Sequence, residues 1–313
     1  MKRRSFLKSL VLLPVAAPLF APNLLLAPKV GRKRYAITMD DPNVKLSAIL
    51  SPTERNGKIL QILDHAKIQA TLFVCGKRVD NAEGKVLLDT WNAAGHSIAN
   101  HTYSHINYND PAITFEVFAT DALRGEGIIA GYNFARFLRF PFLKEGETTV
   151  KRDLMREFLR KRSYKNGSVT IDGSDWYVDA LLQEKLKRDP KADLRPYRDF
   201  YLKHLLARAE FYDGLGLELT GRHVKHTMLV HHTLANALFL GDIIKGFADH
   251  GWKLIDSSEA FADPIFEDRP NIIPAGESLL WSLAKATGKY DAILRYPGED
   301  DSYEKPEMDR LGL

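Results

Sequence analysis

The stretch Tyr-Ala-Ile-Thr-Met-Asp-Asp at residues 35–41 decides the fold, because a short apolar run leads directly into two acids. An apolar run of this length predicts a buried strand. Similar runs recur along the chain and alternate with longer amphipathic segments, which predict helices. This alternation predicts a parallel sheet with helices outside it. Seven such strand–helix units predict an α/β barrel that is closed or nearly closed on itself.

The predicted elements divide the chain of 313 residues into a barrel and two additions. We expect the barrel over residues 28–271, a charged helical insertion at 177–226, and an extended tail at 272–313 with one helix at 276–286. The insertion is either a packed pair of helices or a segment that narrows the substrate groove. The predicted strands are 35–39, 70–74, 97–99, 136–139, 168–171, 227–230 and 253–255. The predicted helices are 56–67, 81–94, 112–130, 149–162, 178–188, 195–212 and 234–249.

Residues 1–27 have the pattern of an export signal: a basic start, a short apolar run and small residues. Arg3-Arg4-Ser-Phe-Leu-Lys is similar to a twin-arginine signal, and an ordinary secretory signal is the alternative. Cleavage is expected after Ala21 or Ala27. The sequence therefore predicts the twin-arginine export machinery as a partner and a periplasmic or extracellular location. The apolar run is too short and too rich in proline to predict a membrane span.

The overall charge gives no sign of a nucleic acid or an anionic membrane as partner. The net charge of +4 comes from 44 Lys and Arg against 40 Asp and Glu. The basic residues of the export signal account for this excess, so the mature chain would be close to neutral. Cys75 is the only cysteine, which excludes an internal disulfide. It lies in an apolar run and is expected to be a small buried side chain.

Two histidines four residues apart, His101 and His105, predict a metal site. We expect them on one side of a helical turn, where two imidazoles suit a single transition-metal ion. Asp40 and Asp41, at the end of a neighbouring predicted strand, would add a carboxylate ligand and a second carboxylate for proton transfer. Paired acids also cap helices, and a single histidine is often structural, so the prediction depends on the combination.

Further polar groups follow the other predicted strands, and the carboxyl ends of parallel strands meet at one face of a barrel. Arg139 would orient a carboxylate and keep it ionised. Asp175 either caps the next helix or accepts a hydrogen bond from a catalytic imidazole and raises its pKa. Trp176 is either core or the wall of a small acyl pocket. Of His231 and His232, one faces the mouth, and strand alternation leaves open which.

These motifs together resemble the polysaccharide deacetylases with a NodB homology domain, carbohydrate esterase family 4. The resemblance runs from about Tyr35 to Ile255, and both the order and the spacing of the motifs agree. Thr38-Met-Asp-Asp41 resembles Thr-Phe-Asp-Asp, His101-Thr-Tyr-Ser-His105 resembles His-Ser/Thr-x-x-His, Arg139-Phe-Pro-Phe142 resembles Arg-x-Pro-Tyr, Asp172-Gly-Ser-Asp175-Trp176 resembles Asp-x-x-Asp-Trp, and Leu229-Val-His231 resembles Leu-x-His.

The resemblance implies a distorted (β/α)7 barrel and one divalent metal ion, usually Zn2+, with Co2+ or another divalent ion as alternatives. The roles that it implies cover the whole set of candidate residues. Asp41, His101 and His105 would be metal ligands, Asp40 the general base and His231 the general acid, with Arg139 positioning Asp40, Asp175 tuning His231, Trp176 and Leu229 lining the acetate pocket, and the Phe142 N–H binding the oxyanion.

Two positions depart from the family pattern. Pro42 replaces the glycine that usually follows the acidic pair, and Phe142 replaces a tyrosine. Neither change removes a catalytic group, because the backbone N–H of residue 142 is retained. A phenol hydroxyl near the sugar is lost, so the substrate contacts are affected more than the chemistry.

The sequence therefore predicts a metal-dependent hydrolase that removes N-acetyl groups from an extracytoplasmic amino-sugar polymer or oligosaccharide, of the peptidoglycan or chitin type. The expected partner is an acetylated carbohydrate. One alternative is a hydrolase of another C–N amide or of O-acetyl esters on xylan, because the same constellation serves both. Another is a non-catalytic carbohydrate-binding protein, against which the intact set of acid, base and ligands argues.

Overall fold

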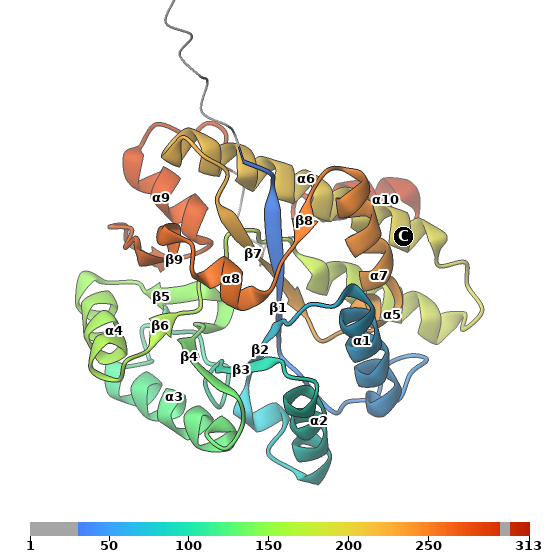
Figure 1. Ribbon diagram of the computed structural model, residues 1–313, viewed down its shortest axis with the longest axis horizontal. Helices are drawn as coiled ribbons and strands as arrows, with labels where there is room; N and C mark the ends of the chain where they lie inside the picture. Colours follow the sequence, from blue (N-terminus) through green and yellow to red (C-terminus); the bar gives the residue numbers. More distant parts are fainter. Residues whose placement is uncertain (1–30, 295–300) are drawn as a thin grey trace, which may run out of the picture. The chain divides into compact units, whose positions relative to one another are not determined.

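The computed structural model describes residues 31–294 and 301–313 (Figure 1). The predicted export signal at 1–27 lies outside these residues. Seven strands form one parallel sheet in the order β6-β4-β3-β2-β1-β7, with β8 beside the start of β1. The strands are β1 (Arg34–Asp40), β2 (Thr71–Val74), β3 (Ser97–Asn100), β4 (Phe134–Leu138), β6 (Lys165–Asn166), β7 (Lys225–His231) and β8 (Lys253–Leu254).

Helices pack on the outside of this sheet, and Figure 1 shows α1 to α4 in an arc along it. A separate antiparallel pair joins β5 (Lys144–Gly146) to β9 (Ala275–Gly276). The α-helices are α1 (Pro52–Ala66), α2 (Ala82–Ala93), α3 (Phe115–Ile129), α4 (Thr149–Lys161), α5 (Asp175–Arg188), α6 (Arg195–Thr220), α7 (Leu234–Asp249), α8 (Ser257–Phe261), α9 (Leu279–Thr287) and α10 (Glu304–Leu311). The short 3-10 helices are η1 (Gly76–Arg78), η2 (Pro141–Leu143) and η3 (Pro264–Glu267).

The predicted α/β barrel is confirmed, and the sheet curls until one irregular segment bridges its two edges. The Gly167 N–H donates to Leu138 O of β4 at 2.8 Å, whereas Ile171 forms an isolated parallel bridge to Met228 of β7. The predicted strand at 168–171 is therefore wrong, because it makes one bridge and no ladder. Gly167 is required there, since a Cβ would lie 2.4 Å from the Phe73 ring.

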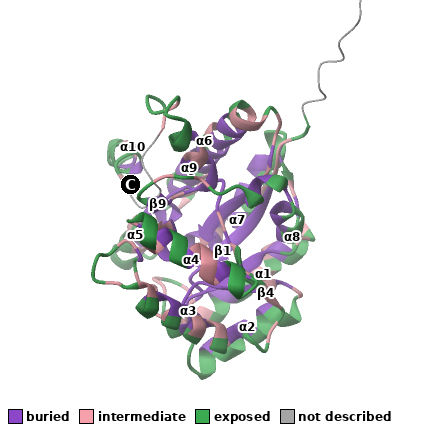
Figure 2. Cartoon of the chain, turned by 90° about the vertical axis from the view of Figure 1, so that its left-hand side faces the viewer, coloured by how far each residue is buried: buried purple, intermediate pink, exposed green. Residues whose placement is uncertain are grey.

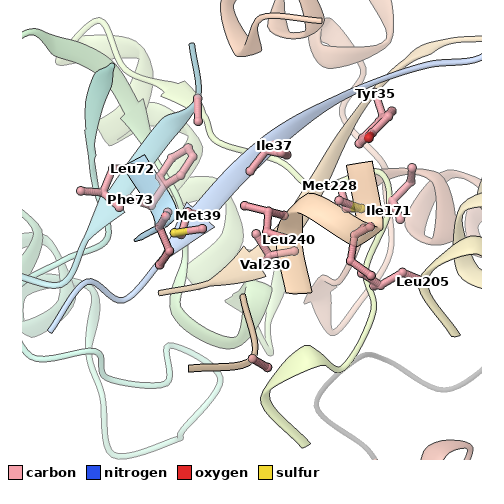
Figure 3. Packing of buried hydrophobic residues seen from close by; sticks show 14 of the residues in the cluster. Tyr35, Ile37, Met39, Leu72, Phe73, Ile171, Leu205, Met228, Val230 and Leu240 are labelled. Carbon is pink, nitrogen blue, oxygen red and sulfur yellow. The ribbon is translucent and has the colours of Figure 1, made fainter. Parts of the chain in front are cut away.

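The core lies between the sheet and its helices, where side chains from β1, β2 and β7 pack together (Figure 3). Ile37, Met39, Leu72, Met228 and Val230 are fully buried. A strand with covered faces reads as a continuous apolar run, which explains why 35–39 is so clear in the sequence. Figure 2 shows this burial along β1, and exposed residues on the outward faces of α2 and α3.

Helix boundaries differ from the predicted ones where capping decides them. Helix α1 begins at Pro52 instead of 56, because Ser51 and Glu54 form a capping box with proline in the first turn. Helix α6 runs to Thr220, past the predicted end at 212, and stops at Gly221 in a left-handed conformation. Helix α10 was not predicted. Among the described residues, no helix is long and apolar enough to cross a membrane.

Candidate active site

A pocket of about 450 Å³ opens at the carboxyl ends of β1, β3 and β7. All predicted site residues except Arg139 line it, and Arg139 is fully buried beneath it. Strand register explains part of this convergence: Asp40 on β1 pairs with His231 on β7 on one side and with Phe73 on β2 on the other. Asp41 adopts a positive φ of 61°, which ends the strand and lets two successive acids line the same pocket.

His101 and His105 lie in an irregular loop, so the predicted helical turn is wrong. The side chain of Asn100 accepts a hydrogen bond from the Thr102 N–H at 2.8 Å, and Thr102 and His105 have φ values of 63° and 57°. A side-chain acceptor of this kind competes with helical hydrogen bonding. The two imidazoles still meet, with ring centroids 4.9 Å apart in an edge-to-face arrangement.

Asp41, His101 and His105 each offer one potential ligand atom, and these atoms lie within 4.8 Å of one another. His101 Nδ1 lies 2.9 Å from Arg139 O, so this nitrogen donates its proton there and Nε2 keeps a lone pair. Asp41 Oδ1 is buried without a hydrogen-bond partner among the described residues. These three side chains, with the unpaired oxygen of Asp41 among their donor atoms, fit one divalent ion that keeps an open coordination position.

The charges of these three groups suit a cation. Burial lowers the pKa of His101 to about 3 and also lowers the pKa of His105, so both rings are neutral at physiological pH. Burial raises the pKa of Asp41. The combined effect of His101, His105 and Arg78 lowers it by more, so the net shift is downward. The site therefore presents two neutral imidazoles and a carboxylate, as metal ligation requires.

Asp40 is held by Arg139 from below. Arg139 Nη1 donates to Asp40 Oδ1 at 2.5 Å, Nη2 donates to Thr38 Oγ1 at 3.0 Å, and Nε donates to Gly167 O at 2.7 Å. Its guanidinium also stacks on Phe73, 3.7 Å from the ring centre. Burial raises the pKa of Asp40 to about 6, against the opposing charge of Arg139. The other oxygen, Oδ2, lies 3.6 Å from His101 Nε2 beside the metal ligands.

Both His231 and His232 border the pocket, but only the His231 ring pairs with Asp175, whereas the His232 ring is directed at Asn56 on α1. His231 Nδ1 lies 2.6 Å from Asp175 Oδ1, and the His231 backbone N–H donates to Asp175 Oδ2 at 2.7 Å. Burial lowers the pKa of His231, but the carboxylates of Asp175, Asp40 and Asp41, with Asp175 contributing most, together raise it to about 9. His232 is buried, with Nε2 3.1 Å from Asn56 Oδ1. Asp175 thus holds an imidazole, and its side chain does not cap α5.

The apolar wall of the pocket comes from Phe142, Trp176 and Leu229. Phe142 has a φ of 56° and is 44% exposed, and its ring lies 4.7 Å from that of His105. Trp176 is 37% exposed, and Leu229 is buried. Two partly exposed aromatic rings at the rim and a buried aliphatic side chain below them make a surface suited to a sugar with a small acyl group.

Sequence reasoning missed Arg78, which lies on η1 just after β2. Its Nη2 is 3.1 Å from Asp41 Oδ2, on the side of the carboxylate that also faces His105. The position follows the same rule as the other site residues, since it lies past the carboxyl end of a predicted strand. Other lining residues outside the predicted site set are Asn43, Phe140, Leu143, Asp172, Ser174, Asp179, His232 and Thr233.

Comparison with known proteins supports the family resemblance. Residues 27–157 match the family model described as "Polysaccharide deacetylase". This part of the chain is similar to that family. The resemblance predicted from the motifs is therefore confirmed. A search of curated proteins finds no match.

Solved structures show the same fold. A mutant of BA3943, described as a CE4 family pseudoenzyme, matches with 19% identity and a TM-score of 0.51, covering 74% of this chain and 67% of that one. The wild-type BA3943 comes from Bacillus anthracis. The polysaccharide deacetylase Bc1974 from Bacillus cereus matches with 18% identity and a TM-score of 0.50, covering 72% of this chain and 92% of that one. At these identities the likeness concerns the fold, which is that of CE4 deacetylases.

Proposed function

We propose that this protein is a metal-dependent hydrolase that removes N-acetyl groups from an extracytoplasmic amino-sugar polymer or oligosaccharide, of the peptidoglycan or chitin type. One observation carries the proposal. A single pocket holds the triad Asp41, His101 and His105, with a carboxylate, Asp40, and a protonated imidazole, His231, on neighbouring strands beside it. An amide hydrolase needs these parts: a metal site, a base and an acid.

Asp41, His101 and His105 would hold a divalent ion, most simply Zn2+, which when bound supplies a Lewis acid for a carbonyl oxygen and lowers the pKa of water. Asp40 would act as the base through Oδ2, because Oδ1 is occupied by Arg139. Arg139 fixes the carboxylate and favours its ionised form, and burial keeps it basic enough to accept a proton near neutral pH.

His231 would deliver the proton to the leaving amine. Its Nδ1 is directed at Asp175, so Nε2 carries the proton that is available to the pocket. The N–H of Phe142 would donate to the developing oxyanion, and Trp176 and Leu229 would enclose the acetyl methyl. The products are acetate and a free amino sugar. Proton removal and proton delivery therefore belong to separate residues on adjacent strands.

Acetate release from a substrate panel tests the proposal. The panel contains chitooligosaccharides, peptidoglycan and acetylated xylan, each with and without a chelator and with Zn2+ restored. We expect chelator-sensitive release from the amide substrates and none from Asp40→Asn protein that still binds metal. Release from xylan alone would favour the esterase alternative. Metal binding with no release from any substrate would refute the enzyme and favour a carbohydrate-binding protein.

We also propose that residues 1–27 direct export by the twin-arginine route, on the strength of the Arg3-Arg4 pattern. Replacing both arginines with lysine should leave the protein in the cytoplasm, whereas an ordinary secretory signal would tolerate the change. Fractionation with antibody detection distinguishes the two routes.

A further inference from the structure

A chain of hydrogen bonds links the long helix α6 to His231 through residues that no family motif includes. The hydroxyl of Tyr201, on α6, donates to Asn236 Oδ1 at 2.8 Å. Asn236 Nδ2 donates to Asp175 Oδ2 at 2.9 Å, and Asp175 Oδ1 lies 2.6 Å from His231 Nδ1. Tyr201 and Asn236 are fully buried, and Asp175 is 1% exposed.

We propose that Tyr201 and Asn236 are positioning residues that fix the Asp175–His231 pair in its working geometry. This inference rests on the proposed function, in which His231 is the acid. It gives a role to part of the 177–226 segment, for which the sequence left open either a packed pair of helices or a segment that narrows the substrate groove.

The orientation of the Asn236 amide follows from its neighbours. Its nitrogen faces two acceptors, Asp175 Oδ2 and the backbone oxygen of His231 at 2.9 Å, so the NH2 group must lie on that side. Its oxygen then faces Tyr201, whose hydroxyl must donate. A flipped amide would place its oxygen against both of these acceptors, Asp175 Oδ2 and the His231 carbonyl oxygen, which is unfavourable in a buried site. The amide therefore holds both the carboxylate and the backbone of His231.

Asp175 depends on this amide because it is a buried charge. It accepts three hydrogen bonds: from the His231 backbone N–H, from the His231 ring and from Asn236. Within the described part of the chain, only the bond from Asn236 comes from outside His231, so it sets where the carboxylate lies relative to the strand end. Asn236 itself lies in the first turn of α7, next to the N-cap Thr233.

Tyr201 is anchored independently of the site. One helical turn further along α6, Leu205 packs in the core beside Ile171 and Met228 (Figure 3). Leu205 also lies against Gly173, where an added Cβ would be 2.8 Å from Leu205 Cδ2. The hydroxyl of Tyr201 is thus presented from a helix that cannot shift without disturbing the barrel core, which makes it a fixed reference for Asn236.

A double-mutant cycle tests the inference, with Tyr201→Phe, Asn236→Ala and the combination. Tyr201→Phe removes one oxygen and keeps the ring. We expect it to lower kcat for acetate release about tenfold with KM unchanged, since one lost hydrogen bond of about 1.4 kcal/mol corresponds to that factor. Asn236→Ala should cost more. The double variant should be no slower than Asn236→Ala, because Tyr201 acts only through Asn236.

Tyr197→Phe is the matched control, because Tyr197 lies one turn earlier on α6 and is also buried. It should keep the wild-type kcat. A second readout needs no activity: the Nδ1 proton of His231, identified by its absence in His231→Gln, should give a downfield NMR signal that shifts or broadens in Tyr201→Phe.

The outcomes separate the inference from the proposed function. If Tyr201→Phe leaves both kcat and the His231 signal unchanged, or if the two substitutions reduce kcat additively, the positioning role is refuted. If wild-type protein releases no acetate but the His231 signal moves as expected, the coupling stands and the deacetylase proposal fails. If Asn236→Ala does not fold, the isosteric Tyr201→Phe variant still decides the question through both readouts.

Discussion

Replacing Asp175 with asparagine should remove most of the proton affinity of His231. Burial alone lowers the pKa of this imidazole, and Asp175 raises it the most among its neighbours, with smaller contributions from Asp40 and Asp41. With a neutral amide in place of the carboxylate, we expect His231 to titrate below about pH 7. Asp175→Asn keeps the size of the side chain, so the change is mainly one of charge.

The magnitude follows from the difference between the ordinary pKa of 6.5 and the value of about 9 in the folded protein. That difference corresponds to about 3 kcal/mol of unfolding free energy. Folded protein binds the proton more tightly than unfolded protein does. The contribution of His231 is therefore complete below pH 6.5 and is lost as the pH rises through 9. Asp175→Asn should abolish this part of the pH dependence.

The assay uses metal-free protein in chelator, so that only groups of the chain titrate. Imidazole nitrogen shifts of His231 are followed by NMR from pH 5 to 10, and urea unfolding is measured at pH 6.5 and pH 9.5. Asp213→Asn is the control, because Asp213 is another buried carboxylate paired with a histidine, His223, at 2.8 Å. It should lower stability and leave the titration of His231 unchanged.

Two results would refute this reasoning. A His231 that titrates below pH 7 in the wild type would show that Asp175 does not overcome the cost of burial. A titration that stays near pH 9 in Asp175→Asn would show that some other group carries the proton affinity. In either case the assignment of His231 as the acid would lose its electrostatic basis.

Three further outcomes are expected. Arg78→Met should weaken Zn2+ binding about 10- to 100-fold in a competition titration, because the guanidinium fixes Asp41; unchanged affinity would contradict that role. Arg139→Met should lower the unfolding free energy by about 3–5 kcal/mol, since it leaves a buried charge on Asp40. Adding Asp40→Asn should restore part of that loss in denaturant unfolding, and a further loss would contradict the pairing. His105→Ala should remove chelator-sensitive acetate release and reduce the bound metal measured by elemental analysis.

Sequence reasoning could place the site because one topological rule covers most of its members. Polar groups that follow the strands of a parallel barrel meet at one face. Asp40 and His231 obey this rule directly, since they lie opposite each other on paired strands. Even the missed Arg78 obeys it. To apply this rule, one needs to know only where each apolar run ends. A fully buried strand shows this end clearly in the sequence, because its apolar run is continuous.

Details that depend on contacts between distant segments could not be predicted in the same way. The His101–His105 spacing fits a helical turn, but the side chain of Asn100 captures a backbone N–H and prevents it. The direction of the His232 ring depends on a contact with Asn56, which lies on α1 far back in the chain. Local pattern contains neither piece of information, because both are settled by tertiary packing.

The proposed base and acid differ chiefly in the charge of the group behind them. Asp40 is buried and His231 is partly buried, and burial opposes the charged form of each: it raises the pKa of Asp40 and lowers that of His231. Arg139 behind Asp40 limits the rise to about 6, whereas Asp175 behind His231, together with the two pocket carboxylates, reverses the fall and brings the value to about 9. Between these values the carboxylate is ionised and the imidazole is protonated at the same time. This is the state that a reaction with proton removal on one side and proton delivery on the other requires. The charged residues beneath the pocket, Arg139 and Asp175, therefore separate the pKa values of the two groups in the metal-free protein.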